Sequence, residues 1–270
     1  MRISLITATY NRTREVEKLF ESLSHQSYSN FELILVDQNQ NNVLDAVVDN
    51  FKYSFKIIHL KTSRLGLSYN RNVGLEHVTG NVVGFPDDDC YYSPNVLESA
   101  VKKFEDDKVK FVLLKATDNL SKETFIQYTN RILSTNDILK LSISFNVFVR
   151  FAKEAKFDEK LGVGAYYGSG EETDYLWSIV KKKDIGRFAE ESCVYHPSNT
   201  ASTDVGRAYK YGLGFGAIFK KQFLRHRDLS SILLFIFYIG RSVGGILFST
   251  HRSFYYYTFL GRLKGFMQYK

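Results

Sequence analysis

Cysteine and proline are scarce in this sequence, and a strand-like run begins directly after Arg2. The two cysteines, Cys90 and Cys193, are too few for a disulfide framework and too far apart for a CxxC pair, which predicts a reducing compartment. Three prolines in 270 residues leave no proline-rich linker. Because no apolar stretch with a small-residue cleavage site follows Met1, we expect no secretory signal and a cytosolic protein.

Extremes of composition are also absent. Hydrophobic residues make up 44% of the chain and charged residues 24%, which argues against disorder, a collagen-like repeat and a polytopic membrane protein. A length of 270 residues fits one large α/β domain with an appendage, or two small domains.

Charge is distributed unevenly along the chain. The formal net charge is +7, but residues 205–270 hold eleven Lys or Arg and a single acid, Asp228. These residues therefore carry +10, and residues 1–204 carry −3. The same tail contains 16 of the 41 aromatic residues. A basic and aromatic surface suits either nucleic acid or the anionic face of a membrane.

The apolar runs in this tail favour the membrane. Ile232–Ile239 and Val243–Phe248 flank Gly240 and Arg241, so the stretch looks short, broken by glycine and charged near its middle. We therefore expect it to lie on a membrane surface rather than to cross the membrane, and the flanking Lys and Arg residues support this interpretation. A buried C-terminal helix packed on the body is the alternative.

Strand-like and helical patterns alternate through the first half of the chain. This alternation predicts an α/β fold with a mostly parallel sheet flanked by helices. A further strand is expected at Ile143–Val149 and a helix from Glu172 to Lys182. Ligands of such sheets bind beyond the carboxyl ends of the strands. The expected strands are Ile3–Ala8, Glu32–Asp37, Phe55–Leu60, Asn81–Phe85 and Phe111–Leu114, and the expected helices are Thr13–Ser24, Val43–Phe51, Ser68–His77 and Pro94–Phe104.

Three consecutive carboxylates follow the fourth of these strands. Asp87, Asp88 and Asp89 repel one another, and partial burial raises the cost of keeping all three ionised. A divalent cation removes that cost, and Mg²⁺ or Mn²⁺ prefers carboxylate oxygens. A solvated acidic turn is the alternative for an isolated Asp triplet. The position at the end of a strand favours the cation site.

A second acidic group, which includes Glu171, Glu172 and Asp174, opens the later helix. Acids in a first helical turn commonly serve only to complement the helix dipole. The preceding loop, Gly162–Gly170, contains four glycines and is expected to be mobile. A carboxylate on such a loop can approach a substrate and act as a general base. We favour Glu172 for this role and Glu171 second.

Five motifs stand in an order that resembles family 2 glycosyltransferases. They are Thr9-Tyr10-Asn11-Arg12, Asp37, Gly66-Leu67-Ser68 followed by Asn70-Arg71-Asn72, Asp87-x-Asp89, and Gly170-Glu171-Glu172. Each motif is weak alone, but five in register are hard to obtain by accident. The resemblance implies a GT-A (Rossmann-like) fold. It also implies an inverting transfer of a sugar from a nucleoside-diphosphate sugar, with UDP as the expected nucleotide.

The resemblance also implies roles for individual residues. Asp89, with Asp87 and His196, would hold Mn²⁺ or Mg²⁺, and Glu172 or Glu171 would deprotonate the acceptor hydroxyl. A lone histidine is more often structural, so His196 has that alternative. Two departures from the family pattern, Thr7-Ala8 before Thr9 and Gln38 after Asp37, leave the nucleotide less certain than the reaction. The residues that would line the nucleotide pocket are Thr9, Tyr10, Asn11, Arg12, Asp37, Arg64, Gly66, Asn70, Arg71, Asn72, Asp87 and Asp88.

Two segments of the tail, Tyr211–Ala217 and Gly261–Phe266, look like C-terminal segments of bacterial transferases that build capsule, exopolysaccharide or O-antigen chains. This resemblance implies a saccharide acceptor linked to a lipid diphosphate, and a protein peripheral to the inner face of the cell membrane. We therefore expect residues 1–204 to form the transferase domain. Residues 1–116 would bind the nucleotide, residues 117–204 the acceptor, and residues 205–270 would form a helical, membrane-associating extension.

Two other functions compete with this interpretation. A sugar nucleotidyltransferase would carry a phosphate loop rich in glycine and lysine after the first strand, and Ala8–Thr13 has neither residue. A nucleic-acid-binding protein without catalysis would use the basic tail, but Ile232–Ile239 would be a poor feature of that surface, so no nucleic-acid partner is expected. The sequence leaves open the donor sugar, the acceptor, the linkage and the oligomeric state, which depend on loops such as Asp118–Arg131.

Overall fold

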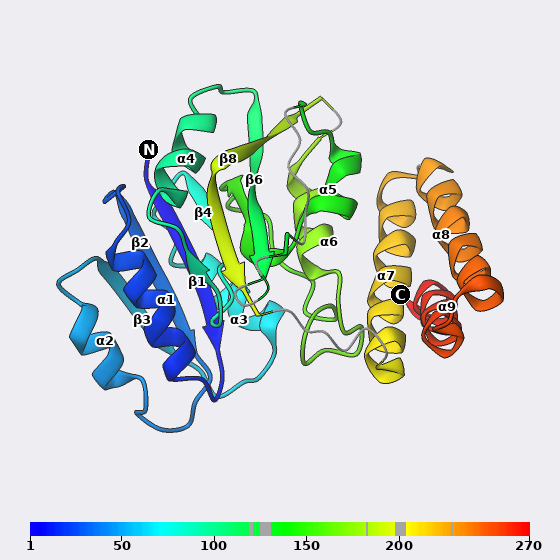
Figure 1. Cartoon of the computed structure of the whole chain (residues 1–270), viewed down its shortest axis with the longest axis horizontal. Helices are drawn as coiled ribbons and strands as arrows, with labels where there is room; N and C mark the ends of the chain where they lie inside the picture. Colours follow the sequence, from blue (N-terminus) through cyan, green and yellow to red (C-terminus); the bar gives the residue numbers. More distant parts are fainter. Residues whose placement is uncertain (119–120, 122, 125–130, 182, 198–203, 228) are drawn as a thin grey trace. The chain divides into compact units, whose positions relative to one another are not determined.

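The computed structural model describes residues 1–118, 121, 123–124, 131–181, 183–197, 204–227 and 229–270 (Figure 1). The chain divides into two compact units, each with its own contacts. The first comprises Met1–Leu65, Tyr69–Lys156 and Tyr175–Ser198, and the second comprises Gly66–Ser68, Phe157–Asp174 and Asn199–Lys270. The predicted boundary at residue 204 stays a prediction, and residues 198–203 beside it lie outside the described residues.

The first unit is built on one sheet with the strand order β3-β2-β1-β4-β7-β6-β8-β5. Four neighbouring pairs are parallel, namely β1 with β2, β1 with β4, β2 with β3, and β6 with β8. Strand β7 is antiparallel to both β4 and β6, and β5 is antiparallel to β8. The predicted mostly parallel sheet is confirmed. The strands are β1 (Ile3–Thr9), β2 (Phe31–Asp37), β3 (Lys56–Lys61), β4 (Val82–Gly84), β5 (Tyr91–Tyr92), β6 (Val109–Asp118), β7 (Val147–Arg150) and β8 (Ile185–His196).

Helices cover both faces of this sheet. Helices α1 (Arg14–Ser24), α2 (Asp45–Phe51) and α4 (Val96–Lys103) contribute apolar side chains to a core shared with alternate residues of β1, β2 and β6. Helix α3 (Leu67–Leu75) packs on the other face, where a Cβ on Gly74 would lie 2.5 Å from Cγ2 of Ile6. The remaining helices before residue 180 are α5 (Thr135–Leu141), a 3₁₀ turn (Ser144–Asn146) and α6 (Glu171–Ile179).

A buried carboxylate joins the strands of this unit. Glu32 on β2 accepts hydrogen bonds from the hydroxyls of Ser4 (2.7 Å) and Thr79 (2.7 Å), and pairs with Arg2 (2.9 Å) and Lys56 (2.9 Å). Burial alone would raise its pKa, but the hydrogen bonds from Thr79, Lys56 and Ser4 lower the pKa to about 2. Glu32 is therefore ionised throughout the neutral range.

Three of the predicted elements differ from the structure as follows. The expected strand Ile143–Val149 begins only at Val147, because the side chain of Asn146 accepts the Ile143 N–H (2.8 Å) and closes the 3₁₀ turn. The expected strand Phe111–Leu114 is the middle of a longer strand that runs on to Asp118. The helix expected from Glu172 to Lys182 spans Glu171–Ile179, and Lys182 lies outside the described residues.

The second unit contains three long helices, α7 (Val205–His226), α8 (Leu229–Phe248) and α9 (Arg252–Gln268), together with the loop before α6. Helices α7 and α9 touch through glycines. A Cβ on Gly216 of α7 would lie 2.1 Å from the Arg262 carbonyl oxygen, and a Cβ on Gly265 of α9 would lie 2.0 Å from the Leu213 carbonyl oxygen. Only glycine permits these two backbones to approach so closely.

Helix α8 corrects one expectation. Gly240 does not break the apolar stretch, which forms one continuous 20-residue helix, because a glycine inside a helix costs only about 1 kcal/mol. Its most apolar window has a mean hydropathy of 1.9, and 17% of that window is buried. Among the described helices, α8 is the one with the length and composition of a membrane span, a criterion that buried core helices can also meet.

Candidate active site

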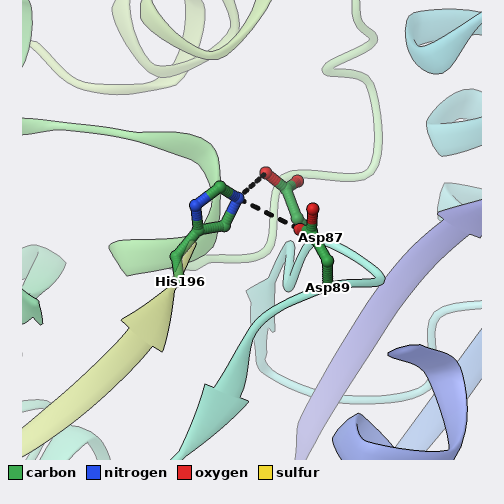
Figure 2. A group of neighbouring side chains, drawn as sticks. All are labelled: Asp87, Asp89 and His196. Carbon is green, nitrogen blue, oxygen red and sulfur yellow. Dashed lines mark ion pairs between the residues drawn. The ribbon is translucent and has the colours of Figure 1, made fainter. Parts of the chain in front are cut away.

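The carboxyl ends of the parallel strands gather polar residues at one edge of the sheet. In the strand register Thr9 lies opposite Asp37, and Asp118 lies opposite His196. The turn Asp87–Asp89 follows β4, which is parallel to β1. Figure 2 shows the result: His196 at the end of β8 points toward the carboxylates of Asp87 and Asp89. The topology thus brings together residues that are far apart in the sequence.

Asp87 is held from two sides. Its Oδ1 lies 2.9 Å from Nη2 of Arg71, a fully buried side chain on α3. The hydroxyl of Ser144, on the 3₁₀ turn before β7, lies 3.1 Å from Oδ1 and 3.2 Å from Oδ2. These contacts fix the orientation of the Asp87 carboxylate.

Arg12 bridges the other two acids of the triplet. Its Nη1 lies 2.7 Å from Oδ1 of Asp88 and 2.5 Å from Oδ2 of Asp89. The turn that presents Arg12 needs a positive φ of 55° at Asn11, a conformation that asparagine tolerates. The N–H of Asn11 donates to Oδ1 of Asn39 (2.8 Å), which stabilises this turn against the end of β2.

The two acids bound by Arg12 differ in their electrostatic environment. Burial raises the pKa of Asp88, and the charge of Arg12 offsets this only in part. Burial acts on Asp89 in the same direction, but contacts with His196 and Arg12 outweigh it and hold the pKa of Asp89 below its ordinary value. Asp89 is therefore the more firmly ionised of the two.

Asp87, Asp89 and His196 fit a divalent cation. One ligand atom from each lies within 4.8 Å of the others. Oδ1 of Asp89 is buried, and its partner in this structure is Nε2 of His196, 3.0 Å away. Two carboxylates suit Mg²⁺ or Mn²⁺, and the imidazole nitrogen favours the softer Mn²⁺.

The His196 ring is oriented for this role. It stacks on Phe145, with ring centroids 4.3 Å apart and an interplanar angle of 8°. Its Nδ1 lies 2.8 Å from the Pro197 carbonyl oxygen, which leaves Nε2 facing Asp87 and Asp89. Histidines that bind metals usually donate their other ring N–H in this way. Burial would lower the pKa of His196, but Asp89 and Asp87 raise it above its ordinary value.

The residues expected to line the nucleotide pocket lie near the same edge of the sheet, and some of them are buried while others are exposed. Asp37 is fully buried and accepts from the backbone and side chain of Asn39 (2.9 and 2.7 Å), with Nε2 of His59 3.0 Å away. The guanidinium of Arg64 lies 4.0 Å from the centre of the Tyr69 ring. Thr9, Asn70 and Asn72 are buried, whereas Tyr10 is exposed.

Gly66, Glu171 and Glu172 belong to the second unit. Gly66 has a φ of 127°, in the region that favours glycine. Glu171 is buried, and a Cβ on Gly162 would lie 3.0 Å from its Cδ. Glu172 is half-buried in the first turn of α6.

Several residues at the edge of the sheet were not expected there from the sequence. Ser144 and Phe145 were placed in a strand, and Asp118 lay beyond the expected end of β6. The polar run that begins at Asp118 was the available signal, because a polar residue directly after a buried strand marks this edge. His59 carried no pattern that would link it to Asp37.

Comparison with known proteins gives a consistent result. Residues 4–169 match the sequence model of glycosyl transferase family 2. The chain is 27% identical over 219 residues to an uncharacterized glycosyltransferase of Haemophilus influenzae, which covers 77% of this chain and 74% of that protein. It is 26% identical over 225 residues to the GalNAc(5)-diNAcBac-PP-undecaprenol beta-1,3-glucosyltransferase of Campylobacter jejuni, which covers 79% and 72%.

Two solved structures share the architecture. A mannosyltransferase from Pyrobaculum calidifontis in complex with GDP-Man and Mn²⁺ has a TM-score of 0.64 at 12% identity, over 98% of this chain and 86% of that one. Staphylococcus aureus TarS in complex with UDP-GlcNAc has a TM-score of 0.61 at 18% identity, over 81% of this chain and 66% of that one. The predicted GT-A fold is confirmed. By the match over residues 4–169, the chain belongs to glycosyltransferase family 2, whose enzymes transfer a sugar from a nucleotide sugar.

Proposed function

We propose that the protein is an inverting, cation-dependent glycosyltransferase that moves a sugar from a nucleoside-diphosphate sugar, with UDP as the expected nucleotide, to a saccharide hydroxyl. The observation that carries this proposal is the Asp87, Asp89 and His196 group at the carboxyl edge of the sheet. Arg12 lies beside these acids with its side chain 42% exposed, so it can meet phosphate oxygens. When bound, the cation would neutralise charge that develops on the diphosphate.

The reaction is a single displacement at the anomeric carbon. Glu172, with Glu171 as the alternative, takes the proton of the acceptor hydroxyl. The acceptor oxygen then forms a bond to the anomeric carbon while the bond from that carbon to the diphosphate oxygen breaks. The electron pair leaves with the nucleoside diphosphate, and the configuration inverts because no covalent enzyme intermediate forms. Arg12 is placed to stabilise the negative charge of the leaving group.

We also propose that the acceptor is lipid-linked and that residues 205–270 attach the enzyme to the inner face of the cell membrane during synthesis of a surface polysaccharide such as capsule. The name of the C. jejuni relative includes an undecaprenol diphosphate carrier. Apolar side chains stand exposed along α8, and Arg241, Arg252 and Arg225 are exposed in the same unit. This combination fits an anionic lipid surface. The exposed apolar residues of α8 are Leu229, Leu233, Ile236, Phe237, Val243, Leu247 and Phe248.

Calorimetric titration with UDP and GDP, each with and without Mn²⁺, tests the proposed reaction. We expect one nucleotide to bind more tightly in the presence of Mn²⁺. Asp89→Ala should abolish that increase. Asp49→Ala is the matched control, because Asp49 is an exposed carboxylate on α2 that pairs only with Lys52 among the described contacts. No binding of either nucleotide by the folded protein would refute the proposal.

A further inference from the structure

The loop Phe157–Asp174 is fastened to the long helices of its own unit by a buried group of charges. Nζ of Lys221, on α7, lies 2.7 Å from Oδ2 of Asp158 and 2.7 Å from Oδ2 of Asp174. The hydroxyl of Tyr269 donates to the same oxygen of Asp158 at 2.5 Å. The side chains of Lys221, Asp158 and Asp174 are 19%, 12% and 4% exposed, so solvent screens this group little.

The backbone of the loop lies close to α7 over the residues that precede α6. A Cβ on Gly214 of α7 would lie 2.1 Å from the Ser169 carbonyl oxygen, and the Ser169 hydroxyl donates to the Tyr211 carbonyl at 3.1 Å. Gly170 has a φ of 88°, and a Cβ there would lie 2.9 Å from Ile218. Glycines of this loop thus serve close packing and left-handed turns, and the mobility expected from the sequence stays a prediction.

The end of α9 and the residue after it, Gln268 and Tyr269, also contact the loop Phe157–Asp174. The hydroxyl of Tyr166 lies 2.9 Å from Oε1 of Gln268. The rings of Tyr167 and Tyr269 have centroids 5.5 Å apart. Helices α7 and α9 therefore both contact the segment that leads into α6.

Asp174 lies in the first turn of α6, the same turn that carries the two acids proposed as general base. Fixing Asp174 fixes the start of this helix, and with it the backbone that carries Glu171 and Glu172. Removing two carboxylates and an ammonium group from water is costly, so such a cluster is a weak source of stability. The clearest effect of this cluster is to fix the positions of Asp158 and Asp174 relative to α7. Burial raises the pKa of Asp174, and the charge of Lys221 acts against that rise.

We propose that Lys221 is a positioning residue for the candidate catalytic base, and that the contacts of Lys221 and Tyr269 with the loop hold that base in place. This inference rests on the proposed function. The residue acts through Asp174 and Asp158, and it does not touch the donor.

The test compares Lys221→Met with three other variants of the full-length protein. Lys221→Arg keeps the positive charge. Lys220→Met removes the neighbouring ammonium group, which lies over the Phe266 ring at 5.2 Å and touches neither acid. Tyr269→Phe removes one hydroxyl from the cluster and leaves both carboxylates paired with Lys221. We expect this variant to fold even if Lys221→Met does not, so the cluster can still be tested.

Three readouts separate positioning from simple loss of folding. Nucleotide binding is measured by calorimetry with UDP, GDP and Mn²⁺, and turnover is measured as nucleoside-diphosphate release from UDP-GlcNAc or GDP-mannose. Hydrogen exchange reports on the amides of residues 157–174. We expect Lys221→Met to bind nucleotide as the wild type does, to turn over at least ten-fold more slowly and to exchange faster in this loop. Lys221→Arg should recover much of the rate, Tyr269→Phe should show a smaller loss, and Lys220→Met should behave as wild type.

The outcomes distinguish failure of this inference from failure of the proposed function. Folded Lys221→Met protein with wild-type turnover, or with unchanged exchange in residues 157–174, would overturn the positioning role. Absence of nucleotide binding by the wild type would instead refute the proposed function, and the exchange measurement would still decide whether Lys221 holds the loop.

Discussion

A pair of glycine substitutions on the long helices should have opposite effects on stability. Gly214 and Gly240 both lie inside helices, α7 and α8, where alanine is favoured over glycine by about 1 kcal/mol. A Cβ added at Gly240 would have no atom within 4 Å, so Gly240→Ala should stabilise the protein by about 0.5–1 kcal/mol.

At Gly214 the same methyl group has no room. Its carbon would lie 2.1 Å from the Ser169 carbonyl oxygen and 2.5 Å from the Ser169 hydroxyl. Close carbon–oxygen contacts in proteins are about 3.3–3.6 Å, so the loop must move by more than about 1 Å. Overpacking of this kind costs about 1–3 kcal/mol, which exceeds the gain in helix propensity. Because both variants gain the same helix propensity, they should differ in stability by the overpacking cost, about 1–3 kcal/mol.

Urea denaturation followed by the fluorescence of Trp177, the single tryptophan and a residue of α6, measures this difference. Because the displaced loop carries the acids at the start of α6, Gly214→Ala should also lower turnover at least ten-fold, while Gly240→Ala should not. Equal stability of the two variants would refute the proposed contact between α7 and the loop. A destabilised Gly214→Ala protein with normal turnover would keep the contact but refute its role in catalysis.

Three other changes test separate features of the molecule. Glu172→Gln should leave nucleotide binding intact and lower turnover about 10²–10⁴-fold, and undiminished turnover would move the base to a neighbouring acid. Because the pKa of Glu32 is lowered from 4.5 to about 2, its stabilisation is present above pH 4.5 and is lost as the pH falls toward 2. The partners of Glu32 are partly exposed, so Glu32→Gln should lower the free energy of unfolding at pH 7 by about 2–3 kcal/mol, measured by urea denaturation. The variant should also not lose stability between pH 4.5 and pH 2 through this residue. Equal stability of the variant and the wild type at pH 7 would contradict the stabilising role of the ionised Glu32. The double variant Leu233→Glu with Phe237→Glu should weaken sedimentation with vesicles rich in phosphatidylserine at least ten-fold. The control, Tyr53→Glu, changes a residue that is 91% exposed on the first unit and should leave sedimentation unchanged. An equal loss in both variants would mean that net charge alone governs vesicle binding.

The alternation of strands and helices made the sheet predictable from the sequence. Once β1, β2 and β4 are known to be parallel, Arg12, Asp37 and the acids after β4 must lie at one edge, because parallel strands share the direction of their carboxyl ends. Local patterns and one rule of topology are enough for this step. They placed the acidic triplet without any knowledge of side-chain contacts.

Non-local pairing was the part that sequence patterns could not supply. β8 pairs with β6 across a long intervening segment, and only that pairing puts Asp118 beside His196. The 3₁₀ turn that delivers Ser144 to Asp87 depends on a single side chain, Asn146, which donates to the carbonyl oxygen of Leu114 at 3.2 Å. Hydrophobic periodicity carries no signal for a turn of three residues. The prediction that Gly240 breaks the apolar stretch of α8 was also wrong, because a glycine weakens a helix without ending it.

The contacts of the acidic triplet also change the reason for expecting a cation there. Three neighbouring carboxylates alone would need a metal cation to offset their repulsion. In the structure, however, Arg71 already pairs with Asp87, and Arg12 pairs with Asp88 and Asp89. His196 pairs with the remaining oxygen of Asp89, Oδ1, at 3.0 Å, so the site can fold without metal. The reason for expecting a cation is then the geometry of Asp87, Asp89 and His196, whose ligand atoms lie within 4.8 Å of one another. It follows that nucleotide should bind weakly without Mn²⁺ through Arg12, since guanidinium groups pair well with phosphates. In Asp89→Ala, Arg12 keeps Asp88 as a partner, so this weak binding should survive while the Mn²⁺-dependent increase disappears. Loss of both would mean that Asp89 is needed to shape the pocket itself rather than to hold a cation.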